Sequence, residues 1–407
     1  MKLASCSSAC PLKVTILAPR WSFSLLDSSC LSRELAVQLA KHWQVQVTLV
    51  VPENSCSESD KREADNNRVT VVEAKEHPGF DDPVDWLSFP PEDLSTDIVV
   101  GVGERLGKIA ELFKTHQKCL SIYVTCSPYE GLRNKLSAFL ERNPGISQLA
   151  DLSVAIGPKM ADELAASLCF CKKKVFNLTP GINNGFRYVS HAPSDREKFR
   201  ILISGCDDPE NFDQEGLGIA ARAVVQLNDK RFQLLFICEV EVEKLQKYAE
   251  KFCQCGIAKS QLNISCTPKC EEEWKGLFCK ADLAIMPSSE QGFGMMALAA
   301  LSSGLPVLVH GDSGFGEALQ PVKFGASSTE DSEDAKVWAK AIKAVQKKDR
   351  KNRLEEAALL RAHYDEKYSW KKQYGVLVET MSSMLSGMNV SIIIKYLHCS
   401  NLQSTVA

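Results

Sequence analysis

The residues best suited to chemistry lie in one stretch, 281–319, where a glycine-rich loop precedes a helix. A short apolar run that closes at Pro287 predicts a buried strand. The loop Gly292–Gly294 follows, and the good helix formers of 295–301 predict a helix that Gly304 ends. Because a helix N-terminus has unpaired N–H groups and the positive end of the helix dipole, this loop could hold a phosphate.

This stretch resembles the donor-binding segment of the retaining, nucleotide-sugar-dependent GT-B glycosyltransferases of group 1. In that family a P-S-x-x-E-G-F-G segment precedes a helix with a second Glu, and G-x-P-V follows. The small, shape-setting residues that match this pattern are Pro287, Ser288, Gly292, Phe293, Gly294, Gly304 and Pro306. Both acids are missing, since Gln291 stands at the position of the first Glu and Ala299 at that of the second.

The resemblance implies further donor contacts, and their positions have also changed. Relatives carry a Gly-Gly pair in the first loop, where this chain has Leu26 and Asp27. They grip the donor diphosphate with an Arg and a Lys after a strand that ends in Gly. The matching positions, beyond Gly205, are Cys206 and Glu215. A neutral thiol and two acids are poor neighbours for a pyrophosphate.

Relatives also carry a His at the end of the fourth strand and another at the end of the fifth. The matching residues here are Val102 and Val124. Histidine is the usual side chain for proton handling near neutral pH, and valine has no proton to give. We therefore assign no catalytic residue. The candidate donor-binding residues are Gly205, Glu290, Gln291, Gly292, Phe293, Gly294 and Glu317.

These losses favour a protein that keeps the fold and no longer transfers sugar. A hydrogen bond to a charged group contributes about 1.5–3 kcal/mol, so four lost contacts weaken donor binding by about four decades or more. Such a protein would bind a protein partner or a modified small ligand, and a nucleotide sugar weakly or not at all. The alternative is an active retaining transferase that uses Glu290, Ser289, Glu317 and the loop 314–316. A phosphorylase-like or epimerase-like GT-B protein is a third hypothesis.

The elements that must position these residues alternate strand and helix. This alternation predicts an α/β fold with parallel sheets. The resemblance implies two Rossmann-like, doubly wound domains that face a cleft (GT-B), with a C-terminal helix that crosses back to the first domain. A loop rather than a helix is expected at 311–319. The expected parts are an acceptor-side domain at 1–182, a donor-side domain at 183–372, and the crossing helix with an irregular tail at 373–407.

The strands are predicted from apolar runs bounded by turns. In the first half they lie at 13–17, 45–51, 69–73, 97–102, 121–125, 150–156 and 175–179, and in the second half at 199–204, 233–238, 262–266, 283–286 and 307–309. Ligands of such domains bind beyond the carboxyl ends of the strands, so the loops that follow the strands should line the cleft.

Composition bounds the function further. The 407 residues carry a net charge of −3, which gives no nucleic-acid footprint, and no apolar run reaches the length of a membrane span. The first eleven residues lack the apolar core of a signal peptide, so we expect a cytoplasmic protein with reduced thiols. The spacing of Cys253, Cys255, Cys266 and Cys270 does not match zinc ribbons, and we expect neither a metal nor a cofactor. The apolar tail at 388–407 is a candidate protein-partner site.

Overall fold

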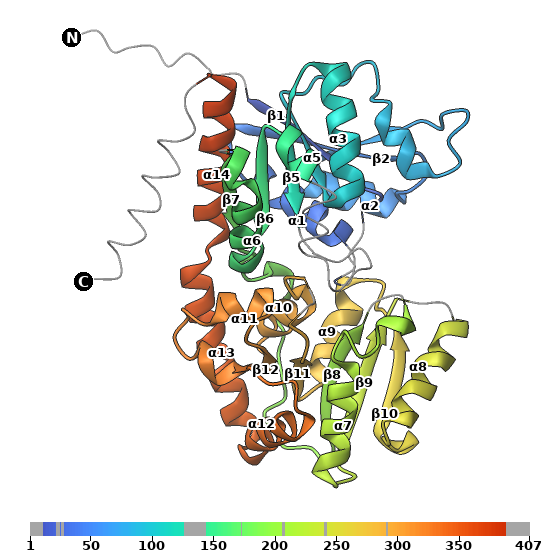
Figure 1. Cartoon of the computed structure of the whole chain (residues 1–407), viewed down its shortest axis with the longest axis vertical. Helices are drawn as coiled ribbons and strands as arrows, with labels where there is room; N and C mark the ends of the chain where they lie inside the picture. The colour runs from blue at the N-terminus through green and yellow to red at the C-terminus, as the bar shows by residue number, and fades with distance from the viewer. Residues whose placement is uncertain are drawn as a thin grey trace, which may run out of the picture.

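The computed structural model describes residues 11–21, 25, 28–125, 144–171, 173–205, 208–239, 242–289 and 292–387. The predictions that lie outside the described residues concern Leu26, Asp27, Cys206, Glu290, Gln291 and the tail at 388–407. The chain forms two α/β halves, one above the other, and the last helix runs beside the first half (Figure 1).

The first half is built on a seven-stranded parallel sheet with strand order β3-β2-β1-β4-β5-β6-β7. Its strands are β1 (Leu12–Leu17), β2 (Val45–Pro52), β3 (Val69–Ala74), β4 (Ile98–Val102), β5 (Leu120–Thr125), β6 (Leu152–Ile156) and β7 (Val175–Leu178). All five residues of β4 and of β6 are buried, because helices cover both faces of the central strands.

The helices of this half connect the strands, and three of them, α2, α5 and α6, have no counterpart in the prediction from the sequence. The helices are α1 (Ser28–Ala40), α2 (Glu58–Asn66), α3 (Gly103–Gln117), α5 (Pro144–Leu149) and α6 (Pro158–Leu168). Ser57 and Asp60 form a capping box that starts α2, a highly charged helix whose one buried residue is Ala64. Such a helix shows little hydrophobic periodicity, so only its cap marks it in the sequence.

The second half is built on a six-stranded parallel sheet with strand order β10-β9-β8-β11-β12-β13. Its strands are β8 (Phe199–Gly205), β9 (Phe232–Cys238), β10 (Leu262–Cys266), β11 (Leu283–Met286), β12 (Val307–His310) and β13 (Thr329–Glu330). Its helices are α7 (Leu217–Leu227), α8 (Val242–Gln254), α9 (Glu271–Lys280), α10 (Met295–Ser302), α11 (Gly314–Leu319), α12 (Ala335–Lys347) and α13 (Arg350–Lys367). The predicted α/β fold with parallel sheets is therefore confirmed.

The loop expected at 311–319 is wrong in its second part, because residues Gly314–Leu319 form the helix α11. Ser313 starts this helix: its hydroxyl oxygen accepts a hydrogen bond of 3.0 Å from the N–H of Gly316. A helix of six residues is too short to show a period of 3.6, so the two glycines pointed to a loop instead.

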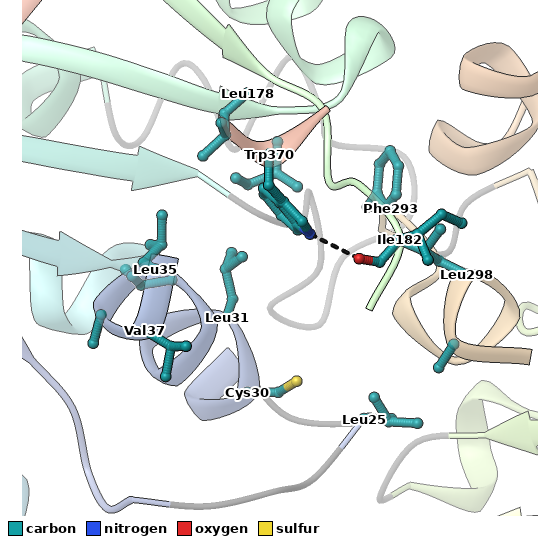
Figure 2. Close-up of a cluster of buried hydrophobic side chains, with 14 of the residues drawn as sticks. Leu25, Cys30, Leu31, Leu35, Val37, Leu178, Ile182, Phe293, Leu298 and Trp370 are labelled. Atoms are coloured by element: carbon teal, nitrogen blue, oxygen red, sulfur yellow. Dashed lines mark hydrogen bonds between the residues drawn. The ribbon is translucent and has the colours of Figure 1, made fainter. Parts of the chain in front are cut away.

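The last helix, α14 (Trp370–Leu385), returns to the first half and packs against α1. Figure 2 shows its Trp370 indole pointing toward the chain segment that joins the halves, where Nε1 donates 3.1 Å to the carbonyl of Ile182. Gln373 bonds both the N–H and the carbonyl of Thr179. One apolar cluster thus runs from α1 through Trp370 to Phe293 of the second half.

Within the described part of the chain, no helix combines the length and the apolarity that a membrane span requires. The cysteines that the structure describes are all free thiols, and their side chains range from buried to exposed. Burial raises the pKa of Cys119 to about 11, so this thiol stays protonated and acts as a small apolar side chain.

Candidate functional site

The carboxyl ends of the two sheets face each other, as two contacts between the halves show. Arg20 follows β1, and its guanidinium lies 3.1 Å from the carboxylate of Glu239, which follows β9. Lys159 follows β6, and its ammonium donates to the carbonyls of Ser289 and Asp312, which follow β11 and β12. The loops at these strand ends therefore form the candidate site, as is usual for α/β domains.

The glycine loop of the second half is held in place by packing at this junction. Phe293 is 3% exposed and packs against Phe315, with ring centroids 5.8 Å apart. A methyl group on Gly157, which follows β6, would lie 2.5 Å from the Phe293 ring, and Gly157 has a φ of +88°. Only glycine fits both the backbone angle and this close approach. The loop thus joins the two halves directly.

The helix α10 begins at this loop with Gly294 as its N-cap, at a φ of +87° and with no side chain capping the first turn. The N-cap residue therefore offers no side-chain acceptor to the first N–H groups, and phosphate binding at this loop stays a prediction. The rest of the helix is apolar and buried, and Ala299 is 1% exposed. No carboxylate reaches the cleft from α10, in contrast to the second Glu of the resembled family.

Glu215 lies near the residues that lead into this loop, and the sequence alone did not predict that position. It is 1% exposed, and a methyl group on Gly205 would lie 2.6 Å from its Oε2. The hydroxyl of Ser288 donates 2.8 Å to the carbonyl of Gln214, and the neighbouring Gly216 packs against the backbone of Pro287. Glu215 therefore lies between the end of β8 and the residues Pro287 and Ser288, which precede the glycine loop.

Val102 and Val124 lie side by side at the carboxyl edge of the first sheet, because they are register partners on β4 and β5. Both are buried in the large apolar cluster. The structure thus brings the two predicted histidine positions together and fills both with side chains that can neither donate nor accept a proton.

A group of charges between α6 and α11 was not predicted from the sequence. Glu163 of α6 and Glu317 of α11 both have a raised pKa, because burial disfavours their charged forms. The ammonium of Lys159 opposes this rise in both, and the carboxylate of Glu317 adds to the rise at Glu163. The sequence signal for α6 was Gly157-Pro158, since proline favours the first turn of a helix.

Among the residues that the structure describes, no three or more His, Cys, Asp or Glu side chains gather as ligands for a metal ion. The junction thus contains the N-terminus of α10, the ammonium of Lys159, and the carboxyl groups of Glu163 and Glu317, one from each half. Of the candidate donor residues, Gly205, Gly292, Phe293, Gly294 and Glu317 lie at this junction.

Known proteins similar to this chain indicate its family. A family model described as "Family 4 Glycosyltransferase in conflict systems" matches residues 16–377. Two D-inositol 3-phosphate glycosyltransferases are similar over a shorter segment. That of Corynebacterium urealyticum is 30% identical over 118 residues, 29% of this chain and 27% of that protein. That of Corynebacterium jeikeium is 30% identical over 138 residues, 31% of each chain. The chain thus spans less than a third of the curated relatives it matches.

Solved structures show the fold over nearly the whole chain. Sucrose-phosphate synthase from Thermosynechococcus elongatus superimposes with a TM-score of 0.70 at 13% identity, over 92% of this chain and all of that one. The Anabaena protein HepE, solved in complex with UDP and glucose, gives 0.65 at 14% identity, over 91% of this chain and all of that one. These likenesses confirm the two-domain, Rossmann-like GT-B fold. The domain boundaries themselves stay a prediction.

Proposed function

Because the chain belongs to the glycosyltransferase family 4 of conflict systems, we propose that it is a GT-B protein that keeps the family's cleft for binding and no longer transfers sugar. Its relatives include D-inositol 3-phosphate glycosyltransferases, and one structural neighbour, HepE, is solved with UDP and glucose. The cleft residues of this chain weaken the binding of such a donor. The cleft therefore serves a protein partner or a ligand without a diphosphate.

The observation that carries the proposal is the buried carboxylate of Glu215 beside Gly205. In the resembled family a lysine at this position attracts the donor diphosphate. At a separation of about 5 Å and an effective dielectric constant of about 20, two like unit charges repel by about 3 kcal/mol. A repulsion of this size between an ionised Glu215 and a diphosphate lowers the affinity by about two decades.

Three further positions support the proposal. Val102 and Val124 supply no proton, and Ala299 supplies no carboxylate to the donor. Two cations that reach the junction within the described residues already have partners: Arg20 pairs with Glu239, and Lys159 bonds two backbone carbonyls. A nucleotide sugar would have to replace these interactions before it gained any from them.

An active retaining transferase is the second candidate, and one arrangement favours it. The uncapped N-terminus of α10 lies beside Ser289, whose carbonyl bonds Lys159. If this lysine turned toward a donor, it would supply the positive charge that Cys206 and Glu215 lack. Glu317 would then be a candidate carboxylate of the second half, because the charge of Lys159 already lowers its pKa against the effect of burial.

Isothermal titration calorimetry with UDP, GDP and UDP-glucose separates the two candidates. We expect the protein to show no saturable binding below about 10 mM, which corresponds to the four lost contacts. Glu215→Gln should tighten UDP binding by about a hundredfold, since it removes the charge and keeps the shape. Glu210→Gln, an exposed acid of the same segment, is the matched control and should change nothing measurable.

A working transferase would give the opposite results. Micromolar UDP binding by the unaltered protein, or hydrolysis of UDP-glucose that Glu290→Ala abolishes, would establish the second candidate. Thermal unfolding of each variant without ligand shows whether a change in binding reflects the site or the fold.

A further inference from the structure

A second concave site lies at the edge of the second sheet that faces away from the cleft. It is a cavity of about 370 Å³ at the amino ends of the strands, where Phe199 begins β8 and Phe232 begins β9. Residues 346–349, which form the end of α12 and its link to α13, close one side. Figure 1 places α12 at the end of the molecule farthest from the first half. The cavity is therefore separate from the candidate donor site.

Charged side chains dominate the lining of this cavity. The cationic residues are Arg196, Lys198, Arg231, Lys347, Lys348 and Arg353, and the anionic residues are Asp195, Glu197, Asp282 and Asp349. Six positive and four negative side chains line the space. Two of the cations also have acidic partners outside the lining, since Arg231 pairs with Asp229 and Lys348 pairs with Glu356.

Most of the carboxylates in the lining already accept hydrogen bonds from the protein. Asp282 is 2% exposed and pairs with the buried guanidinium of Arg350. Asp195 accepts 3.0 Å from the backbone N–H of Arg350. Asp349 caps α13 and accepts 2.8 Å from the N–H of Asn352. Their acceptor capacity is thus largely used within the protein, and Glu197, which is exposed, is the exception.

Four of the six cations already bond carbonyls or carboxylates of the protein, and two retain their capacity to donate. In the described part of the chain, no hydrogen bond or ion pair engages the side chain of Lys198 or Lys347. Arg353 is 5% exposed and is fixed beneath them by the carbonyl of Lys348, at 2.7 Å, and by the ring of Phe199, at 5.0 Å. Buried aromatic walls lower the local dielectric, which strengthens the attraction of these cations for an anion.

We propose that this cavity binds a small phosphorylated organic molecule, with its phosphate held by Lys198 and Lys347 against the fixed Arg353. A phosphomonoester carries about −1.5 to −2 charges at neutral pH, which matches the two positive charges of Lys198 and Lys347. Cavities of roughly 300–1,000 Å³ hold small organic ligands, so the space suits an ester better than a bare phosphate ion. Charge-assisted hydrogen bonds from lysine and arginine are the usual means of phosphate recognition.

The test is calorimetry on the full chain with ribose 5-phosphate as the probe and inorganic phosphate as the comparison. We expect saturable binding of ribose 5-phosphate with a Kd below about 1 mM. The double variant Lys198→Ala/Lys347→Ala should weaken it at least tenfold. Lys371→Ala/Lys372→Ala removes the same charge from two exposed lysines of α14 and should leave the Kd unchanged. Glu197→Gln should tighten binding several-fold, because it removes a competing negative charge.

Three results would overturn the proposal. One is the absence of saturable binding up to about 10 mM. Another is equal weakening in the two double variants, which would mean that binding follows total charge rather than this site. The third is equal affinity for inorganic phosphate and ribose 5-phosphate, which would leave no role for the organic part. The exposed lysines carry no packing, so these variants should fold, and circular dichroism checks this.

Discussion

Replacing Lys159 with methionine should loosen the junction between the two halves of the molecule. The ammonium donates to the carbonyls of Ser289, at 3.1 Å, and Asp312, so the substitution removes two charge-assisted hydrogen bonds across the junction. Each contributes about 1.5–3 kcal/mol when fully buried. Lys159 is only half-buried, and discounting for solvent leaves about 1.5–3 kcal/mol for the pair.

This loss should depend on pH. Burial raises the pKa of Glu163 and of Glu317 above the usual 4.5, and Lys159 opposes that rise. A group whose folded pKa is raised contributes stability that is present below its unfolded pKa and is lost as pH rises through the folded pKa. Without the lysine, both folded pKa values rise further, so the penalty extends to higher pH. The difference between Lys159→Met and the unaltered protein should therefore be larger at pH 7.5 than at pH 4.

Hydrogen exchange of the backbone amides in α6 and α11 measures the local opening directly. After correction for intrinsic rates, 1.5–3 kcal/mol corresponds to exchange that is about 10 to 150 times faster at pH 7.5. Amides of α12, on the far side of the second half, should not change. Lys372→Met is the matched control, since this lysine is exposed on α14. Unaltered protection of α11 in Lys159→Met, or an equal effect at both pH values, would refute this reasoning.

Two further predictions concern the stability of the fold. Gly157→Ala should cost more than about 2 kcal/mol in unfolding free energy, because the positive φ and the Phe293 ring at 2.5 Å both exclude a methyl group. Gly276→Ala, in α9 with nothing within 4 Å, should instead stabilise by about 0.5–1 kcal/mol, and urea unfolding compares the two. Asp282→Ala leaves the guanidinium of Arg350 buried without its partner and should cost about 3–5 kcal/mol. A Tm within 2 °C of the unaltered protein, where about 3 kcal/mol predicts several degrees, would show that the pair does not hold the second half together.

The sequence alone determined the architecture, because the signals for it are local. Apolar runs bounded by glycine and proline gave both parallel sheets, and the small residues from Pro287 to Pro306 gave the shape of the loop and of α10. The absence of charge at Ala299 was visible in the same way. Positions such as Leu26 and Gln291 lie outside the described residues, so their roles stay predictions.

Only the tertiary structure decided which charges meet. Lys159 lies 130 residues from Ser289 and 153 from Asp312, and Glu215 reaches Gly205 through a turn with no regular period. The second cavity gathers its lining from separate segments in the same way. Hydrophobic periodicity fixes which face of an element is buried, but it contains no information on which distant loops the packed elements bring together.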